Sequence, residues 1–332
     1  MANSPDPEEL AAAIRTGRRA ALSRAITLAE STRADHRALA ASVLDRLAPL
    51  PQGTIRIGIS GVPGAGKSTL IDALGSMLTE QGHKVAVLAV DPSSVRSGGS
   101  ILGDKTRMHR LASDANAFVR PSPSSGTLGG VAAKTRETML LCEAAGFDVV
   151  IVETMGVGQA EVAVAGMVDL VVLLMIAGGG DELQGIKKGI LEIADIVALN
   201  KADGEDRPRA ERAASELRSA LNILSPPSPD WRVPVLTVSG ATGAGLDALW
   251  ETVLRHRAVH QANGAWQARR AGQRIGWLKA SLDEALRRRV LSGKQARAAL
   301  AEAEAAVGTG SRAPTAVAEE ILDRLGLPGE PT

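Results

Sequence analysis

The sequence of 332 residues predicts an α/β fold built on a doubly wound, mainly parallel sheet. Short runs rich in Val, Ile and Leu alternate with segments of helical periodicity through the middle of the chain. Most of these runs are continuously apolar, as in parallel strands that helices cover on both faces. Helical crossovers between them predict right-handed βαβ units. The expected strands are TIRIGIS at 54–60, KVAVLAV at 84–90, AFVRP at 117–121, DVVIVET at 148–154, DLVVLLMI at 169–176, ADIVALN at 194–200 and VPVLTV at 233–238.

Helical segments flank this region on both sides. Residues 1–50 are rich in Ala, Leu and Arg at helical spacing and form an N-terminal helical extension, which a Pro- and Gly-bearing break ends. Residues 51–258 form the central domain, and residues 259–332 are again helical. An apolar stripe runs along this last segment, which has little core of its own. It must pack on the central domain or on a second subunit, and we favour a dimerisation arm.

The motif GVPGAGKS at 61–68 fits the pattern G-x-x-x-x-G-K-[ST] and lies between an expected strand and an expected helix. Its glycines allow several backbone N–H groups to point at a β-phosphate, and the helix N-terminus adds the positive end of its dipole. Lys67 is expected to reach the β- and γ-phosphate oxygens as a catalytic residue, and Ser68 to ligate Mg²⁺. A plain glycine turn is the alternative, but the strand–loop–helix context favours a P-loop NTPase fold. The expected phosphate-binding residues are Gly61, Val62, Pro63, Gly64, Ala65, Gly66, Lys67, Ser68 and Thr69.

The sequence NKAD at 200–203 closes the sixth expected strand. The carboxylate of Asp203 can accept hydrogen bonds from guanine N1–H and from the exocyclic amine, whereas adenine has an acceptor at N1 and no 2-amine. An unpaired, partly buried carboxylate costs about 1–3 kcal/mol or more, so the motif predicts guanine specificity. The loop after the seventh expected strand is expected to back the base, although SGATGAG also fits a plain turn. The expected base-binding residues are Asn200, Lys201, Asp203, Ser239, Gly240 and Ala241.

Carboxylates at the ends of expected strands are candidate Mg²⁺ ligands. Asp91 and Glu153 each follow a strand at the carboxyl edge, where α/β sheets bind ligands, and Asp104 lies in the glycine-rich SGGSILGDKTR. With Ser68 they form the expected metal set, acting directly or through water because Mg²⁺ keeps several waters. Glu153 is also expected to act in catalysis, and Gln159 to orient an attacking water. The alternatives are solvent-exposed caps and turns for the carboxylates, and a surface position for Gln159.

The overall composition disfavours several classes of partner. The 38 basic and 37 acidic side chains nearly cancel, which gives no case for nucleic acid or an anionic membrane as the main partner. The longest apolar stretch, at 170–177, is far short of the roughly 20 residues of a membrane-spanning helix. Cys142 is the single cysteine, so no intrachain disulfide is expected, and the polar N-terminus lacks the order of a signal peptide. These features predict a cytoplasmic protein.

Taken together, the motifs resemble the MeaB/ArgK family of GTPases, to which methylmalonic aciduria type A proteins also belong. The resemblance implies a Mg²⁺-dependent GTP hydrolase that serves as a G-protein chaperone of an adenosylcobalamin-dependent acyl-CoA mutase, chiefly methylmalonyl-CoA mutase. GTP hydrolysis would gate cofactor loading and protect or reactivate the mutase. The stretches that carry the resemblance are GVPGAGKST, AVLAVDPSS, SGGSILGDKTRM, RPSPSSGTLGGVA, FDVVIVETMGVGQAE, GGGDELQGIKKGILEIADI and NKAD.

The same resemblance implies a homodimer and three switch segments. Residues 92–108 would be the first switch, which holds Asp104 near Mg²⁺, and residues 154–162 the second. Residues 178–188 would signal to the mutase, although a charged, glycine-led loop is otherwise a solvated connection. The chain has no D-x-H-x-x-G cobalamin signature, so the resemblance places adenosylcobalamin on the partner. The candidate contacts of the third switch are Asp181, Glu182, Lys187 and Lys188.

Two other functions compete with this interpretation. A metal-insertion GTPase for a nickel enzyme would need clustered Cys and His ligands, but the five histidines are scattered and the cysteine stands alone. A kinase or a transport-linked ATPase is disfavoured by the guanine motif and by the absence of a membrane segment. Nucleotide turnover with ATP and GTP, with and without a mutase, would separate these possibilities.

Overall fold

The computed structural model of the chain describes residues 5–90, 108–121, 128–154, 159–177, 191–223 and 230–327. The expected residues Asp91, Asp104, Asp181, Glu182, Lys187 and Lys188 lie outside these ranges. By the packing of its backbone the chain forms two compact units, Met1–Arg270 and Ala271–Thr332. The three segments expected from composition remain a prediction.

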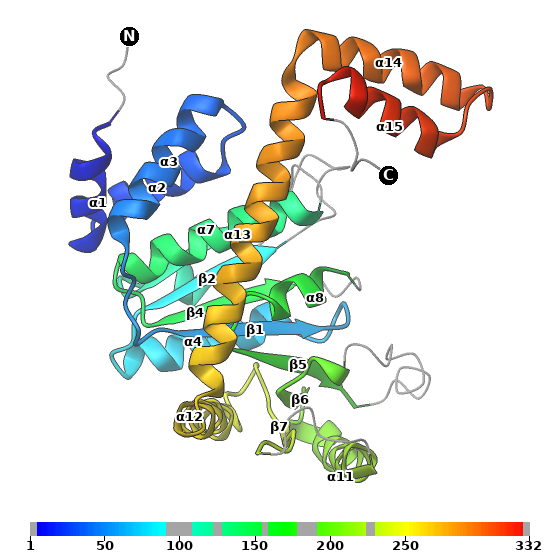
Figure 1. Ribbon diagram of the computed structural model, residues 1–332. Helices are drawn as coiled ribbons and strands as arrows, with labels where there is room; N and C mark the ends of the chain where they lie inside the picture. Colours follow the sequence, from blue (N-terminus) through cyan, green and yellow to red (C-terminus); the bar gives the residue numbers. More distant parts are fainter. Residues whose placement is uncertain are drawn as a thin grey trace. The chain divides into compact units, whose positions relative to one another are not determined.

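The first unit contains a sheet of seven strands, all parallel, at the positions that the sequence predicts. Its order is β3-β2-β4-β1-β5-β6-β7, so β1 lies between β4 and β5 (Figure 1). In register, Ile57 of β1 lies opposite Ile151 of β4 and Leu170 of β5. The strands are β1 Ile55–Gly61, β2 Val85–Val90, β3 Ala117–Pro121, β4 Val149–Thr154, β5 Leu170–Ile176, β6 Ile196–Asn200 and β7 Val235–Thr237.

This order places a topological switch point at β1. Strands β2 to β4 lie on one side of β1 and strands β5 to β7 on the other. Loops that leave neighbouring strands in opposite directions open a crevice at the carboxyl edge of the sheet, where ligands of α/β proteins bind. The phosphate motif follows β1 directly, so the fold puts it at this crevice.

Helices cover both faces of the sheet. Ile57 and Ile59 point to the face covered by α4, where they share one apolar core with Leu70 and Leu74. Gly58 points to the opposite face, where an added Cβ would lie 3.0 Å from Cγ1 of Val164 on α8. The helices of this unit are α1 Pro7–Arg15, α2 Arg19–Glu30, α3 Ala34–Leu47, α4 Lys67–Glu80, α6 His109–Ser113, α7 Leu128–Ala144, α8 Gln159–Ala165, the 3-10 helix η2 Gly204–Asp206, α11 Arg207–Ile223 and α12 Leu246–Ala262.

Helices α1 to α3 precede β1 and pack on one another. Helices α2 and α3 also pack on α7, which lies on one face of the sheet (Figure 1). The fold class predicted from the sequence is therefore confirmed as an α/β protein with a parallel, helix-covered sheet.

Buried ion pairs fix the amino edge of the sheet. Arg56 of β1 donates two hydrogen bonds to Glu143 of α7, at 2.6 and 2.9 Å. Arg270, in helix α13 Ala265–Ser292, donates to both carboxylate oxygens of Asp169 at 2.7 and 2.6 Å. Arg270 also donates to the Thr54 carbonyl at 2.6 Å. These pairs tie α7 and the first turns of α13 to the amino ends of β1 and β5.

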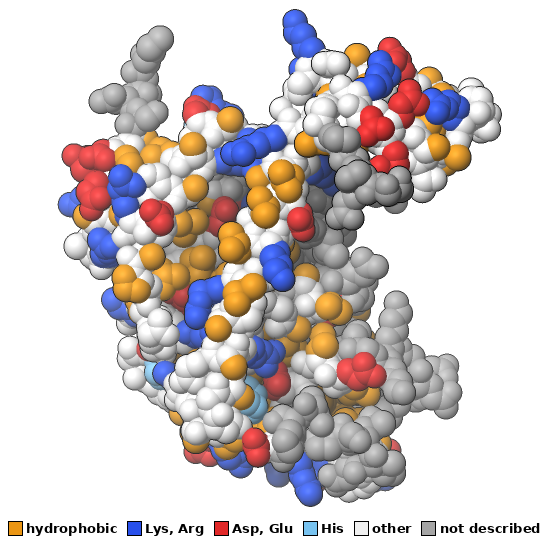
Figure 2. All heavy atoms as spheres, viewed as in Figure 1, with side chains coloured by type: hydrophobic (Ala, Val, Ile, Leu, Met, Phe, Trp, Pro, Cys, Tyr) orange, Lys and Arg blue, Asp and Glu red, His pale blue; other side chains and the backbone are white. Residues whose placement is uncertain are grey.

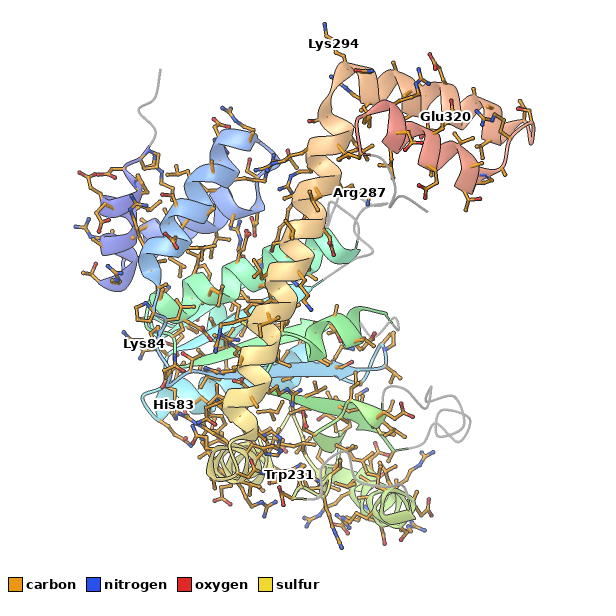
Figure 3. The ribbon with its side chains drawn as sticks, in the orientation of Figure 1. His83, Lys84, Trp231, Arg287, Lys294 and Glu320 are labelled. Carbon is orange, nitrogen blue, oxygen red and sulfur yellow. The ribbon has the colours of Figure 1, made fainter. Side chains whose placement is uncertain are left out.

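The indole of Trp231, labelled in Figure 3, lies between α12 and the residue that precedes β6. Its Nε1 donates to the carbonyl of Asp195 at 2.8 Å. Its ring meets the buried His256 of α12 edge-on, with 4.9 Å between ring centroids. His256 in turn stacks on His260 at 4.0 Å. His256 Nε2 also lies 3.5 Å from Oδ1 of Asp195, so both histidines belong to the packing around this indole.

The second unit is helical throughout its described residues and comprises the rest of α13 with α14 Lys294–Gly308 and α15 Pro314–Arg324. Lys294 begins α14 and Glu320 lies on α15, which packs on α14 (Figure 3). Figure 2 shows hydrophobic side chains along α13 that are open to solvent. These exposed residues are Ile275, Leu278, Leu282 and Leu286. In the described part of the chain, no helix has both the length and the apolar composition needed to cross a membrane.

Candidate functional site

The phosphate loop joins the end of β1 to the start of α4, as predicted. Two of its glycines are required by close approach of other backbone or side-chain atoms. A Cβ at Gly61 would lie 2.1 Å from the carbonyl oxygen of Leu174 on β5. A Cβ at Gly66, which caps α4 with φ of 85°, would lie 2.6 Å from Nδ2 of Asn200. The glycine spacing of the motif therefore reflects the packing of the loop against β5 and β6.

Lys67 is the first residue of α4, and its side chain is buried under the loop. Its Nζ donates to the carbonyls of Gly61 at 2.7 Å and Val62 at 3.0 Å. Burial lowers the pKa of the Lys67 ammonium, while the negative charges of Glu153 and Glu161 act in the opposite direction. An ammonium held in this way is available to phosphate oxygens, since its present partners are neutral carbonyls.

Ser68 and Glu153 meet at the carboxyl edge of the sheet. The Ser68 hydroxyl donates to Oε1 of Glu153 at 2.9 Å. Glu153 lies opposite Ile59 in register, so its side chain points to the face of the sheet that α4 covers. A hydroxyl and a carboxylate are hard oxygen donors of the kind Mg²⁺ prefers, and these two residues fit a Mg²⁺ site beside the phosphate loop. Among the described residues, no group of three or more His, Cys, Asp or Glu side chains is arranged to hold a metal.

Asn200 connects the phosphate loop to the loop after β7, which is predicted to bind the base. It is buried at the end of β6, where its Nδ2 donates to the Ala65 carbonyl at 2.7 Å. Its Oδ1 accepts from the Gly240 N–H at 3.0 Å. Gly240 itself lies directly on α4, since a Cβ there would be 2.8 Å from the Leu70 nitrogen. One amide side chain therefore holds these two loops in a fixed arrangement relative to each other.

Asp203 and Ser239, two other residues that the sequence predicts to bind the base, lie in contact with each other. The Ser239 hydroxyl donates to Oδ2 of Asp203 at 2.8 Å, which orients this half-buried carboxylate. Lys201 has φ of 61°, the left-handed conformation that non-glycine residues rarely adopt. Such backbone strain is concentrated at functional sites. The carboxylate retains acceptor capacity for guanine N1–H and the 2-amine.

The remaining predicted nucleotide-binding residues lie on the same two loops. Pro63, Gly64 and Thr69 are exposed on the phosphate loop and the first turn of α4, and Ala241 is exposed after Gly240. The backbone of Gln159 begins α8, and its side chain lies outside what is described. The structure thus brings the phosphate, base and two of the metal residues to one edge, while the assignment of each role remains a prediction.

Glu161 is a buried residue near this site that the sequence argument missed. It follows Gln159 by two positions and is 1% exposed. The available signal was an acidic residue in the segment after β4, within the residues 154–162 that the resemblance assigned to the second switch. Sequence periodicity gave no reason to expect that its carboxylate is buried.

Comparisons with known proteins show which family the chain is similar to. The model of a family described as "Methylmalonyl Co-A mutase-associated GTPase MeaB" matches residues 22–295. The chain is similar to the GTPase ArgK of Escherichia coli, with 49% identity over 86% of each chain. It is 50% identical to the mitochondrial methylmalonic aciduria type A homolog of Mus musculus, over 79% of this chain and 66% of that protein. A solved structure described as LAO/AO transport system kinase is similar over 98% of this chain and 99% of that chain, with 36% identity and a TM-score of 0.74.

Proposed function

The chain belongs to the MeaB family of GTPases, and from this premise we propose that it is a Mg²⁺-dependent chaperone of an adenosylcobalamin-dependent acyl-CoA mutase. Methylmalonyl-CoA mutase or a close relative is the proposed client, because the matching family is described as associated with that enzyme. The name of the mouse relative, methylmalonic aciduria type A homolog, also refers to the methylmalonyl group. In this proposal GTP hydrolysis gates cofactor loading and protects or reactivates the mutase, which carries the adenosylcobalamin.

The observation that best supports nucleotide binding is the pair of hydrogen bonds made by the Asn200 side chain. This side chain joins the phosphate loop to the base-binding loop through hydrogen bonds at 2.7 and 3.0 Å. A nucleotide whose base is held by Asp203 would then present its phosphates to Lys67 and to the N-terminus of α4. Replacing Asp203 by Asn should move the preference from guanine to xanthine nucleotides, because an amide donates where the carboxylate accepts. Unchanged GTP affinity in this variant would count against the base assignment.

Ser68 and Glu153, with Asp91 and Asp104, are the proposed Mg²⁺ ligands. When bound, the cation would neutralise charge on the β- and γ-phosphate oxygens. Lys67 would donate to the same oxygens as negative charge shifts toward the leaving group. We assign to Gln159 the orientation of the attacking water.

The proposed contacts to the mutase lie in the segment 178–188. Asp181, Glu182, Lys187 and Lys188 offer both signs of charge there, which favours recognition of a polar protein surface. We also propose a cytoplasmic location, in keeping with the single, buried cysteine.

We propose that the protein is a homodimer that associates through α13. Ile275, Leu278, Leu282 and Leu286 recur at intervals of three and four residues and therefore share one face of the helix. Leu278 is 69% exposed and the others are at least half exposed, which is unusual for a row of large apolar side chains. A second copy would cover this row. Sedimentation of the wild-type chain and of Leu278→Lys would test it: a monomeric wild type would contradict the proposal.

The decisive experiment compares turnover of GTP and ATP by the full chain, alone and with methylmalonyl-CoA mutase. We expect turnover of GTP only, a complex with the mutase, and a change in GTP hydrolysis on its addition. Hydrolysis of GTP without binding to any acyl-CoA mutase would refute the chaperone role and leave the GTPase intact. Preference for ATP would refute the base assignment.

A further inference from the structure

The Glu161 carboxyl group is buried near the phosphate loop, and nothing described so far gives it a role. Four acidic side chains are buried in the described part of the chain, and three of them accept hydrogen bonds. Glu143 accepts two from Arg56, and Asp169 and Glu153 also have donors. Glu161 is 1% exposed, and neither of its oxygens has a hydrogen-bond partner among the residues that the structure describes. Glu161 therefore differs from the other buried carboxylates of this protein, each of which accepts a hydrogen bond.

Such an arrangement is costly in a folded protein. Acidic side chains are almost never fully buried unless they are paired, because an unpaired charge loses its hydration without compensation. A buried polar group that has no protein partner in a native fold indicates an ordered water, an ion or a catalytic role. The group on Glu161 is an acceptor with up to four lone-pair directions, so it fits donors such as water bound to a cation.

The packing of α8 fixes where this carboxylate lies. Helix α8 packs on β1 and β4 and connects β4 to β5. Because both strands are parallel, the helix between them runs antiparallel to β1. Val164 lies over Gly58, so Glu161, one turn earlier on the same helix face, lies toward the carboxyl end of β1. The phosphate loop begins at that end.

The electrostatic effect of Glu161 on Lys67 also places the Glu161 carboxylate near the phosphate loop. The Glu161 carboxylate is close enough to the Lys67 ammonium for its charge to act on it, together with that of Glu153. Lys67 Nζ nevertheless donates to the carbonyls of Gly61 and Val62, so it leaves Glu161 unpaired. The single positive charge of Lys67 is fewer than the two negative charges of these carboxylates, so a triphosphate bound beside them requires a further cation.

We propose that Glu161 is a positioning residue for the divalent cation of the nucleotide site, and that its carboxylate accepts hydrogen bonds from water molecules bound to that cation. Mg²⁺ keeps several waters in protein sites, and each water has protons that need acceptors. Outer partners of this kind orient the ligands of a metal and raise its affinity. This inference rests on the proposed function as a guanine-nucleotide enzyme.

A structural role and a positioning role predict opposite effects on stability. If Glu161 supported the fold, its replacement would destabilise the protein. If it is retained for the cation, replacing it should stabilise the empty protein by removing a buried carboxyl group whose oxygens have no hydrogen-bond partner among the described residues. Glu161→Gln keeps one acceptor oxygen and loses the charge, whereas Glu161→Met has similar length and no good acceptor. The two variants therefore form a graded series.

The test measures Mg²⁺ affinity and stability separately, on the full chain. Wild type, Glu161→Gln, Glu161→Met and the exposed control Glu251→Gln are titrated with MgCl₂ in the presence of saturating fluorescent GDP. GDP affinity is measured in EDTA, and the thermal midpoint without nucleotide or metal. We expect the Mg²⁺ half-saturation concentration to rise about tenfold in Glu161→Gln and further in Glu161→Met. GDP affinity in EDTA should not fall, and the midpoint of the empty protein should rise by roughly 2 °C or more.

Each outcome has one reading. Unchanged Mg²⁺ half-saturation in both variants, or a lowered thermal midpoint in both, would overturn the assignment of Glu161. A wild-type chain that binds no GDP would overturn the proposed function, and this role with it. Glu251→Gln should match the wild type in all three measurements, because its side chain is exposed on α12.

Discussion

Replacing Asn200 by Ala should weaken nucleotide binding and the fold together. Asn200 is the residue through which β6 holds both the phosphate loop and the base-binding loop. Removing its amide leaves the Ala65 carbonyl and the Gly240 N–H without their partners, and both residues are buried. Two loops that are now held in one arrangement would then be ordered only when a nucleotide binds.

The magnitude follows from the two hydrogen bonds. An unsatisfied buried donor or acceptor costs about 1–3 kcal/mol, so the pair sums to about 2–6 kcal/mol. The lower end is expected, because water can enter the space left by the amide at the ligand-binding edge. A loss near 2 kcal/mol should lower the thermal midpoint of the empty protein by roughly 4 °C or more. Loss of preorganisation should also weaken GDP binding by about tenfold or more.

The assay is a titration with fluorescent GDP combined with thermal unfolding without nucleotide. Asn263→Ala is the matched control, because Asn263 also makes two hydrogen bonds, to Asp230 at 2.8 Å and from Ala265 at 3.0 Å, but is exposed. This control should shift the unfolding free energy by about 0.5 kcal/mol or less. If Asn200→Ala behaved like Asn263→Ala in both measurements, the Asn200 side chain would not have the role we assign to it.

Three further predictions concern the rest of the first unit. Arg270→Ala should lower the free energy of unfolding, measured by urea titration, by about 3–5 kcal/mol, because it leaves Asp169 buried without its cation. The control Arg288→Ala removes an exposed ion pair on the same helix and should lower the free energy of unfolding by about 0.5 kcal/mol or less. Burial raises the pKa of the Cys142 thiol, so a disulfide reagent should modify one thiol per chain in denaturant and none in the native protein. Burial lowers the pKa of His260 below its ordinary 6.5, so the unfolded chain takes up the proton first. The free energy of unfolding should therefore be constant above about pH 6.5 and should fall as the pH drops below 6.5. The fall should be smaller in His260→Gln. Urea midpoints that do not change as the pH drops below 6.5 would contradict the burial argument.

The sequence alone determined the strands, the phosphate loop and the guanine motif. All seven expected runs are strands of one parallel sheet, from β1 at Ile55–Gly61 to β7 at Val235–Thr237. These features are local: a run of β-branched residues, or a glycine spacing with a Lys and a Ser, acts within a few residues of itself. The family resemblance rests on the same local stretches.

Only the tertiary structure decided which side chains from distant segments share a site or a buried pair. The distance from Asn200 to Ala65, from Ser68 to Glu153, and from Arg270 to Asp169 depends on strand order and on helix packing. No periodicity encodes strand order, because every strand of a helix-covered parallel sheet has the same apolar pattern. Glu161 is the sharpest case. Its place after Gln159 is plain in the sequence, yet its burial and lack of partners arise from the packing of α8 over Gly58.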